Sequence, residues 1–278
     1  MHHKSRSLSV VLAAATAALT LAGCAGGPAD PSGSAESSET GSESGLSLQD
    51  VQDAGTLVVA TEGTYRPFSY HEGGSGDLTG YDVEVVTAVA DKLGVDIEFQ
   101  ETQWDAIFAG LEAGRFDLIA NQVSINDERE ESYDFSEPYT VSPGVLIVAE
   151  DSDIASFDDL EGRTSAQSLT SNWYEIAESS GANVEAVEGW AQAVELLKQG
   201  RVDATVNDEL TFLDAQKNGE TDGLKVAAES DDVSYNAFAL RKGSDSLVEA
   251  IDAALAELRT DGTLAEISEK YFGADVSE

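Results

Sequence analysis

The sequence predicts an α/β fold with two similar lobes, each built on an open, largely parallel sheet flanked by helices. Two observations support this prediction. Short apolar runs typical of buried strands alternate with longer stretches whose apolar residues recur at helical spacing, which is the pattern of βαβ units. One such unit also occurs twice in the chain with the same internal spacings, as expected if the two lobes are built alike.

The elements of the first lobe follow in order along the chain. Residues 55–61 (GTLVVAT) are predicted to form a buried strand, and residues 81–93 carry apolar side chains along one helical face. Residues 95–99 form the next strand. Residues 104–114 then form a helix that stops at a glycine, and residues 116–120 form a further strand. Strands that alternate with helices of this length favour a parallel sheet.

The repeated unit consists of a helix starting at tryptophan, a glycine stop, an Arg-apolar-Asp sequence, a strand and an asparagine. Its two copies occupy residues 104–121 and 190–207. Chance similarity of so short a pattern is the alternative. If the repeat is structural, residues 121–122 and 207–208 lie at the carboxyl ends of corresponding strands, where open α/β sheets bind ligands. The repeat therefore predicts a cleft between the lobes.

The predicted boundaries assign residues 46–141 to lobe 1, residues 142–237 to lobe 2 and residues 238–278 to a C-terminal return onto lobe 1. The chain is expected to cross between the lobes near residues 138–147 and 235–240, because these segments enclose the second copy of the repeat. The returning segment carries apolar side chains at helical spacing in two predicted helices: Leu247, Ile251, Leu255 and Leu258, then Leu264, Ile267 and Tyr271.

The N-terminus is predicted to be a lipoprotein signal peptide over residues 1–23, since a basic stretch precedes an apolar run too short to span a membrane. The small residues before Cys24 resemble the lipobox of bacterial lipoproteins, in which the thiol is acylated; a buried or unmodified cysteine is the alternative. Residues 24–45 are rich in Gly, Ser and Glu and lack large apolar side chains, which indicates a lipidated flexible tether.

Composition excludes several classes of function. The net charge of −38 argues against a nucleic-acid partner and is explained by solubility. Cys24 is the only cysteine, which rules out internal disulfides, thiolate metal clusters and Cys-His catalysis. Once the signal peptide is removed, His71 is the only histidine, so two-histidine metal sites are ruled out as well. We also expect no catalytic residue, metal or cofactor.

Residues 121–139 (NQVSINDEREESYDFSEPY) place one arginine, Arg129, between a predicted strand end and a Pro-Tyr turn. The planar guanidinium can bind both oxygens of a carboxylate at once, which fixes the position and direction of an anionic group. The alternative is that Arg129 belongs to a solvated helix start, paired with neighbouring acids.

Several motifs in the mature domain occur in a fixed order: EGTYRPF at 62–68, GYDVEV at 80–85, TQWD at 102–105, NQVSINDER at 121–129, SNW at 171–173 and KYFGADV at 270–276. Together they resemble the extracytoplasmic solute-binding proteins (family 3) of polar amino-acid ABC importers, and within them the cystine-binding branch. The resemblance covers essentially all of the mature domain. It implies a two-lobed periplasmic-binding-protein fold (type II) with a two-strand hinge.

The resemblance also implies roles for individual residues. The ligand's α-carboxylate would be bound by Arg129 with Ser124, Ser171 and Asn172. Its α-ammonium would be bound by Asp208 and Gln122. A solvated acid is the alternative for Asp208, whose place in the repeat favours the ligand role. The side-chain pocket would be formed by Glu62, Tyr65, Trp104, Asn121 and Trp173, with a plain core position as the alternative for Trp104. We assign Trp190 to the core.

Two positions depart from the family pattern: residues 164–170 are unusually polar, and Trp173 stands where tyrosine is common. Both lie near the implied ligand contacts of the second lobe. We expect a monomer, lipid-anchored on the extracytoplasmic face of the cell membrane, that captures L-cystine or a related polar amino acid and delivers it to an ABC permease and its ATPase.

Two other functional classes are the alternatives. A dehydratase-type enzyme on the same fold would act on a prephenate-like acid and use Glu62 for proton transfer. A receptor's sensor domain would need a spanning helix and a signalling domain, and the sequence predicts neither.

Overall fold

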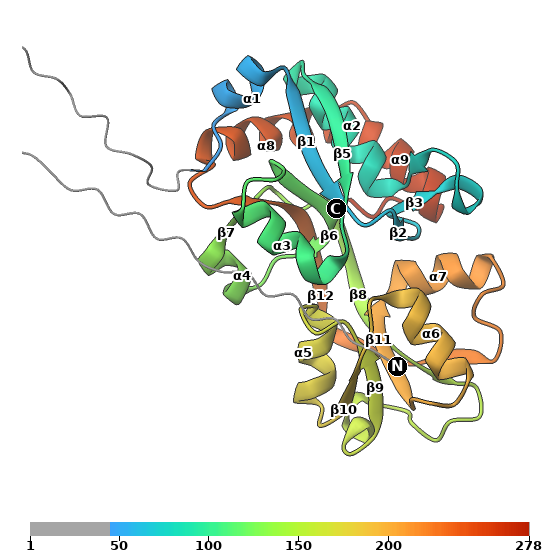
Figure 1. Ribbon diagram of the computed structural model, residues 1–278. Coiled ribbons are helices and arrows are strands. Elements are labelled where there is room, and N and C mark those ends of the chain that lie inside the picture. Colours follow the sequence, from blue (N-terminus) through green and yellow to red (C-terminus); the bar gives the residue numbers. More distant parts are fainter. Residues whose placement is uncertain (1–44, 278) are drawn as a thin grey trace, which may run out of the picture. The chain divides into compact units, whose positions relative to one another are not determined.

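The computed structural model describes residues 45–277, which belong to one compact unit. The predicted signal peptide, Cys24 and all but the last residue of the predicted tether lie outside the described residues. Figure 1 shows the elements in chain order. No helix in the described part of the chain has the length and apolar character needed to cross a membrane.

The N-terminal elements form the first lobe together with the C-terminal ones. In chain order they are α1 (Leu48–Ala54), β1 (Thr56–Thr61), β2 (Thr64–Tyr65), β3 (Ser69–His71), a 3₁₀ turn (Glu72–Gly74), β4 (Leu78–Thr79), α2 (Tyr81–Leu93), β5 (Asp96–Glu101), α3 (Trp104–Glu112), β6 (Leu118–Ser124), α4 (Asp127–Ser132) and β7 (Tyr133–Phe135). The C-terminal helices are α8 (Asp245–Thr260) and α9 (Thr263–Phe272).

The second lobe lies between two long crossing strands, β8 (Thr140–Ala149) and β12 (Leu224–Arg241). Its own elements are a 3₁₀ turn (Phe157–Leu160), β9 (Thr164–Gln167), α5 (Asn172–Ser179), β10 (Asn183–Ala186), α6 (Trp190–Lys198), β11 (Ala204–Asp208) and α7 (Glu209–Lys217). The two copies of the predicted repeat are therefore α3 with β6 and α6 with β11. Each copy has a left-handed glycine after its helix, Gly114 and Gly200, where a side chain would be strained.

One nine-stranded sheet runs through both lobes in the order β10-β9-β11-β8-β12-β6-β1-β5, with β7 paired to β12. Within each lobe the pairs are parallel: β1 with β5 and β6, and β9 with β10 and β11. The crossing strands β8 and β12 pair antiparallel with each other and with their other neighbours. In Figure 1 these two strands connect the upper and lower groups of elements. The fold class predicted from the sequence is confirmed.

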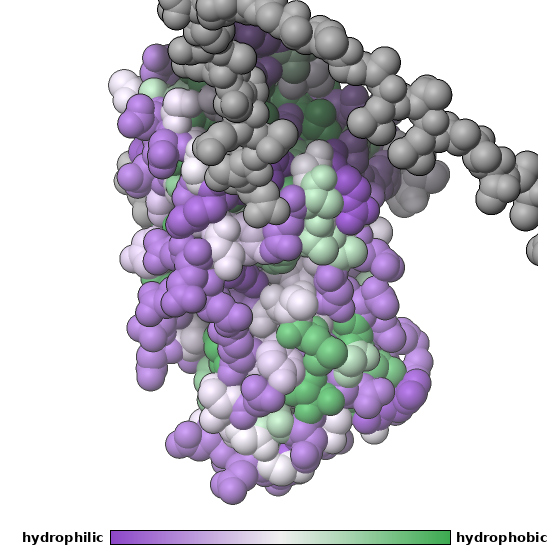
Figure 2. Space-filling view, turned by 60° about the vertical axis from the view of Figure 1, so that its left-hand side comes forward, coloured by the Kyte–Doolittle hydropathy of each residue, from purple (hydrophilic) through white to green (hydrophobic). Residues whose placement is uncertain are grey.

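Four buried apolar clusters stabilise the lobes, two in each. The largest contains Leu247, Ile251 and Leu255 of α8 together with Val85 and Val89 of α2, so the last helices of the chain complete the core of the first lobe. The residue boundaries of the lobes stay a prediction. Hydrophilic residues predominate on the face shown in Figure 2, as the composition leads one to expect.

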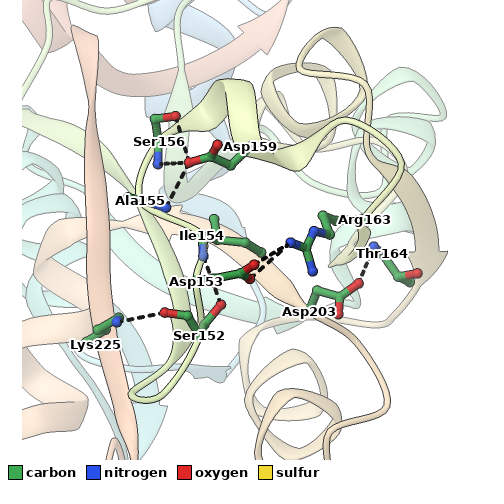
Figure 3. Close-up of polar contacts among 10 residues, drawn as sticks. All are labelled: Ser152, Asp153, Ile154, Ala155, Ser156, Asp159, Arg163, Thr164, Asp203 and Lys225. Atoms are coloured by element: carbon green, nitrogen blue, oxygen red, sulfur yellow. Dashed lines mark hydrogen bonds and ion pairs between the residues drawn. The ribbon is translucent and has the colours of Figure 1, made fainter.

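Polar contacts hold the connection between β8 and β9 to the second lobe (Figure 3). Asp153 accepts hydrogen bonds from Nη2 of Arg163 at 3.0 and 3.1 Å. Lys225 of β12 donates to the carbonyl oxygen of Ser152 at 3.1 Å. Because Arg163 and Asp153 are exposed, their ion pair orients the connection and contributes little to stability.

Candidate ligand-binding site

A cavity of about 210 Å³ lies between the lobes, at the edge of the sheet where β6 and β11 end. A single water molecule needs only about 10–15 Å³ in comparable terms, so the cavity can hold an organic molecule. The first lobe contributes Glu62, Thr64, Tyr65, Trp104, Asn121 and Gln122. The second lobe contributes the strand and helix ends that carry Gln167, Ser168, Ser171, Asn172, Trp173, Glu188, Trp190, Gln192 and Asn207.

On the first-lobe wall, a hydrogen-bond network orients Glu62. Asn121 accepts a hydrogen bond from the backbone N–H of Glu62 at 2.8 Å and donates one from Nδ2 to Glu62 Oε2 at 2.7 Å. Burial raises the pKa of Glu62 to about 7, against the lowering effect of the Asn121 hydrogen bond. Nε1 of Trp104 and Oε1 of Gln122 are buried without hydrogen-bond partners in residues 45–277, and both atoms lie beneath the surface of this wall.

Arg129 lies on α4 beside the cavity and is 8 % exposed. It donates from Nη1 to the carbonyl oxygen of Ser124 at 2.8 Å and from Nη2 to that of Thr170 at 3.1 Å. Its guanidinium carbon also lies 5.5 Å from the ring centroid of Trp104. Burial lowers its pKa to about 10, so the side chain stays cationic at neutral pH. The solvated-helix alternative is therefore wrong, although Arg129 does lie in a short helix.

Arg129 has no acidic partner within the described residues. Its neighbour Thr170 directly precedes α5, whose N-cap is Ser171. The Ser171 hydroxyl accepts from the backbone N–H of Tyr174 at 3.1 Å, and the first amide groups of the helix end at the cavity wall with Asn172. A buried cation beside a helix N-terminus favours an anionic group.

Asp208 caps the N-terminus of α7 and is 1 % exposed, so the solvated alternative for this acid is wrong. Its Oδ1 accepts from the backbone N–H of Leu210 at 2.8 Å and its Oδ2 from the Ser142 hydroxyl at 2.5 Å. Burial raises the pKa of Asp208 to about 6 despite these two hydrogen bonds. Two hydrogen bonds leave further lone pairs of the carboxylate for another donor.

Aromatic side chains from both lobes surround the cavity: Tyr65, Trp104, Trp173 and Trp190. Trp173 lies against Gly144 of β8, where an added Cβ would be 2.5 Å from Cζ3 of the indole, so the absence of a side chain at Gly144 makes room for this ring. Trp190 was assigned to the core from the sequence. Trp190 does pack against an apolar core cluster of the second lobe, but it is only half-buried and also lines the cavity, so the assignment was incomplete.

The structure brings eight of the eleven predicted ligand residues to the cavity wall and leaves Ser124, Arg129 and Asp208 directly behind or beside it. It adds residues for which no role was predicted, among them Gln167 and Gln192, and it places Asn207 in the wall, as the repeat predicted for this strand end. The repeat could have predicted that Trp190 lines the cavity, because Trp104 and Trp190 are the first residues of corresponding helices. No sequence signal singled out Gln167 or Gln192.

The two lobes touch on both sides of the cavity. The Tyr65 hydroxyl donates to Oδ1 of Asn207 at 3.0 Å, and the Thr170 hydroxyl donates to Oδ1 of Asp105 at 2.7 Å. With the hydrogen bond from Arg129 to Thr170, these contacts join the rims of the lobes. The two lobes are therefore in direct contact beside the cavity.

The family model of the bacterial extracellular solute-binding proteins, family 3, matches residues 57–274. The chain belongs to this family. It is 50 % identical over 229 residues to the L-cystine-binding protein TcyA of Bacillus subtilis, a match that covers 82 % of this chain and 85 % of that protein.

Two solved structures show the same fold. The L-cystine solute receptor of Neisseria gonorrhoeae, in its unliganded open conformation, is 47 % identical with a TM-score of 0.57, over 83 % of this chain and 98 % of that one. An ancestral arginine-binding protein bound to arginine is 35 % identical with a TM-score of 0.74, over 79 % of this chain and 99 % of that one. The more similar sequence thus has the less similar arrangement, as expected if this chain is closed and the receptor open.

Proposed function

We propose that this protein captures a polar L-amino acid by closure of its lobes and delivers it to an ABC permease and its ATPase. The preferred ligand is L-cystine. The observation that carries the proposal is the pair of buried, opposite charges beside one cavity, Arg129 from the first lobe and Asp208 from the second. Neither forms an ion pair within residues 45–277. A zwitterion can leave water only where both of its charges meet hydrogen-bonded groups of opposite sign.

Within this site, Arg129 and the N-terminus of α5 would bind the α-carboxylate, with Ser124 holding Arg129 in place through its carbonyl oxygen. Asp208 and the unpaired Oε1 of Gln122 would accept hydrogen bonds from the α-ammonium. For both groups, this requires the ligand to reach past the present cavity wall, since neither Asp208 nor Oε1 of Gln122 is exposed to the cavity.

The choice of cystine is supported by the similarity to cystine-binding proteins and by the aromatic and polar side chains that line the cavity. Divalent sulfur makes favourable contacts with aromatic rings, and tryptophans and a tyrosine from both lobes surround the cavity. Glu62, Gln167 and Gln192 supply polar groups that a second amino-acid end would need.

Calorimetric titration with L-cystine, L-cysteine, L-arginine, L-histidine and D-cystine tests the proposal. We expect the tightest binding for L-cystine and weak binding for dithiodipropionate, which has both carboxylates of cystine but no amino group. Small-angle scattering should show a smaller radius of gyration with saturating L-cystine, since ligand shifts a two-lobed protein toward its closed state. No binding by any amino acid of the panel would contradict the function itself.

A lipid anchor at Cys24 and a monomeric state are part of the proposal. The family description places its members outside the cytoplasm, and an anchor on the predicted tether would keep the binding domain near its permease.

The dehydratase alternative has one observation in its favour, the pKa of Glu62 near 7, which suits a general acid or base. Incubation with prephenate, followed by ultraviolet detection of an aromatic product, tests it; we expect none.

A further inference from the structure

Asp82, the second residue of α2, is fully buried behind the cavity wall. Its Oδ2 accepts a hydrogen bond from the backbone N–H of Gln122 at 2.7 Å, and its Oδ1 accepts one from Gln122 Nε2 at 2.6 Å. It forms no ion pair in the described part of the chain. Burying a carboxylate without a cation opposes folding, so its presence here calls for a specific role.

Gln122 has an unusual backbone conformation. Its φ of 50° lies in the left-handed region, and every other positive φ among residues 45–277 belongs to a glycine. A side chain makes this conformation unfavourable, so it persists only where its surroundings determine it. The two hydrogen bonds to Asp82 hold both the backbone and the side chain of Gln122 in this conformation.

The register of the sheet changes at the same place. Val123 pairs with Ala237 of β12, whereas Ile119 pairs with Ala239, so β6 carries extra residues around Gln122 and forms a bulge. Bulges next to binding sites redirect the side chains that follow them. Gln122 also donates from Nε2 to the Thr140 hydroxyl at 3.1 Å, which connects the bulge to the first residue of the crossing strand β8.

The residues on either side of the bulge belong to the site. Asn121 lines the cavity and orients Glu62, whereas the carbonyl oxygen of Ser124 accepts the hydrogen bond from Arg129. The bulge therefore sets the position of the arginine relative to the cavity wall. Asp82 holds this bulge without lining the cavity itself.

We propose that Asp82 is a positioning residue of the binding site: its carboxylate fixes the bulge at Gln122 and, through it, the location of Arg129. This inference rests on the proposed function where it is tested by ligand affinity. Where it is tested by amide hydrogen exchange without ligand, it rests on the structure alone. It predicts that Asp82 is needed because residue 122 is strained, and that a glycine at 122, which tolerates φ of 50°, reduces this need.

The test compares wild type with Asp82→Asn, Gln122→Gly and the double variant at pH 8, using L-cystine as the probe. Asp82→Asn should weaken binding at least tenfold, because the amide accepts at one oxygen only and places a donor against Gln122. In the Gln122→Gly background the same substitution should cost less than threefold. Asp91→Asn, on the exposed face of the same helix, is the matched control and should bind as wild type.

Amide hydrogen exchange without ligand is the second readout. Faster exchange over residues 118–129 in Asp82→Asn, reduced in the double variant, would support the inference. Unchanged exchange there, or equal affinity losses from Asp82→Asn in both backgrounds, would overturn it. Absence of amino-acid binding by wild type would contradict the proposed function only, since the exchange readout does not depend on it.

If Asp82→Asn does not fold, Gln122→Gly and Gln122→Ala decide the question with Asp82 intact. Both remove the same amide side chain, and only alanine is strained at this φ. Slower exchange over residues 118–129 in the glycine variant than in the alanine variant supports a bulge that Asp82 must hold. Equal exchange would overturn the inference.

Discussion

Arg66 of the first lobe forms an ion pair with Asp214 of α7 in the second, with 3.2 Å between Nε and Oδ2. The guanidinium carbon of Arg66 also lies 4.0 Å from the ring centroid of Tyr70, which holds the side chain in place. This pair joins the lobes without lining the cavity, so it stabilises the closed arrangement whatever the ligand is.

We therefore expect Arg66→Ala to weaken the binding of every amino acid by a similar factor. The factor should be roughly fivefold, since exposed ion pairs contribute about 0.2–1 kcal/mol and Asp214 is only 11 % exposed, which puts this pair at the upper end. Arg163→Ala is the matched control. Arg163 is as exposed as Arg66, at 39 % against 38 %, and its partner Asp153 lies in the same lobe. Calorimetry on both variants checks this, and a loss confined to one ligand would show that Arg66 acts through ligand contacts instead.

Arg129→Lys should weaken binding of L-amino acids by about 2–5 kcal/mol, because lysine cannot reproduce the planar fork that donates both to Ser124 and to a ligand carboxylate. Titration calorimetry measures the loss, with Arg163→Lys as the control substitution. An affinity within threefold of wild type would mean that the ligand's carboxylate lies elsewhere.

Asp208→Asn should weaken ligand binding yet stabilise the protein without ligand at pH 8. The folded pKa of about 6 lies above the value of ~3.9 for an unfolded aspartate. Between these values the folded state binds more protons than the unfolded state, so the contribution of Asp208 to stability falls as pH rises from about 4 to about 6. Because asparagine does not ionise, the variant avoids this loss of folding stability, which is on the order of 2 kcal/mol for wild type. Asparagine also still caps α7.

Urea unfolding of wild type and Asp208→Asn at pH 4 and pH 8 checks the sign of this effect. The variant should gain stability relative to wild type only at the higher pH. A variant that is destabilised equally at both values would make Asp208 a structural residue.

Cys24→Ser should release the protein from membranes, because acyl chains contribute about 0.8 kcal/mol per buried methylene. Fractionation of cells with a high-salt wash measures it, and Ser→Ala at Ser37, in the predicted tether, is a control that should stay in the membrane fraction. Recovery of Cys24→Ser in the pellet after the wash would count against the anchor.

Local sequence patterns predicted the helices that carry a long apolar face, whereas the shorter helices α1, α5 and α7 were not predicted. The apolar residues of α2 recur at helical spacing between two glycines, and the predicted range of 81–93 agrees with the observed Tyr81–Leu93. Strand β6 is longer than predicted, since it continues to Ser124, where its partner on β12 is Asn236. That partner lies far along the chain, and a local pattern carries no information about it.

The same limit applies to the site. The acidic neighbours of Arg129 suggested a solvated helix, and only its contact with Thr170, 41 residues away, shows that the guanidinium is buried between the lobes. Asp82 lies in the GYDVEV motif, but no role was predicted for it, because the first turn of a helix commonly carries an acid. Its hydrogen bonds to Gln122 span 40 residues, and the left-handed conformation that they support is rarely adopted by glutamine.

The return of the chain to the first lobe affects the order in which that lobe can fold. Leucines of α8 complete the apolar cluster beneath α2, and β12 supplies the neighbour of β6. During synthesis, the ribosome makes these segments after the whole second lobe, so the lobe that carries Arg129 cannot reach its final core until translation is nearly finished. A fragment cut near residue 141 should accordingly stay loosely packed, and adding the C-terminal piece in trans should restore it.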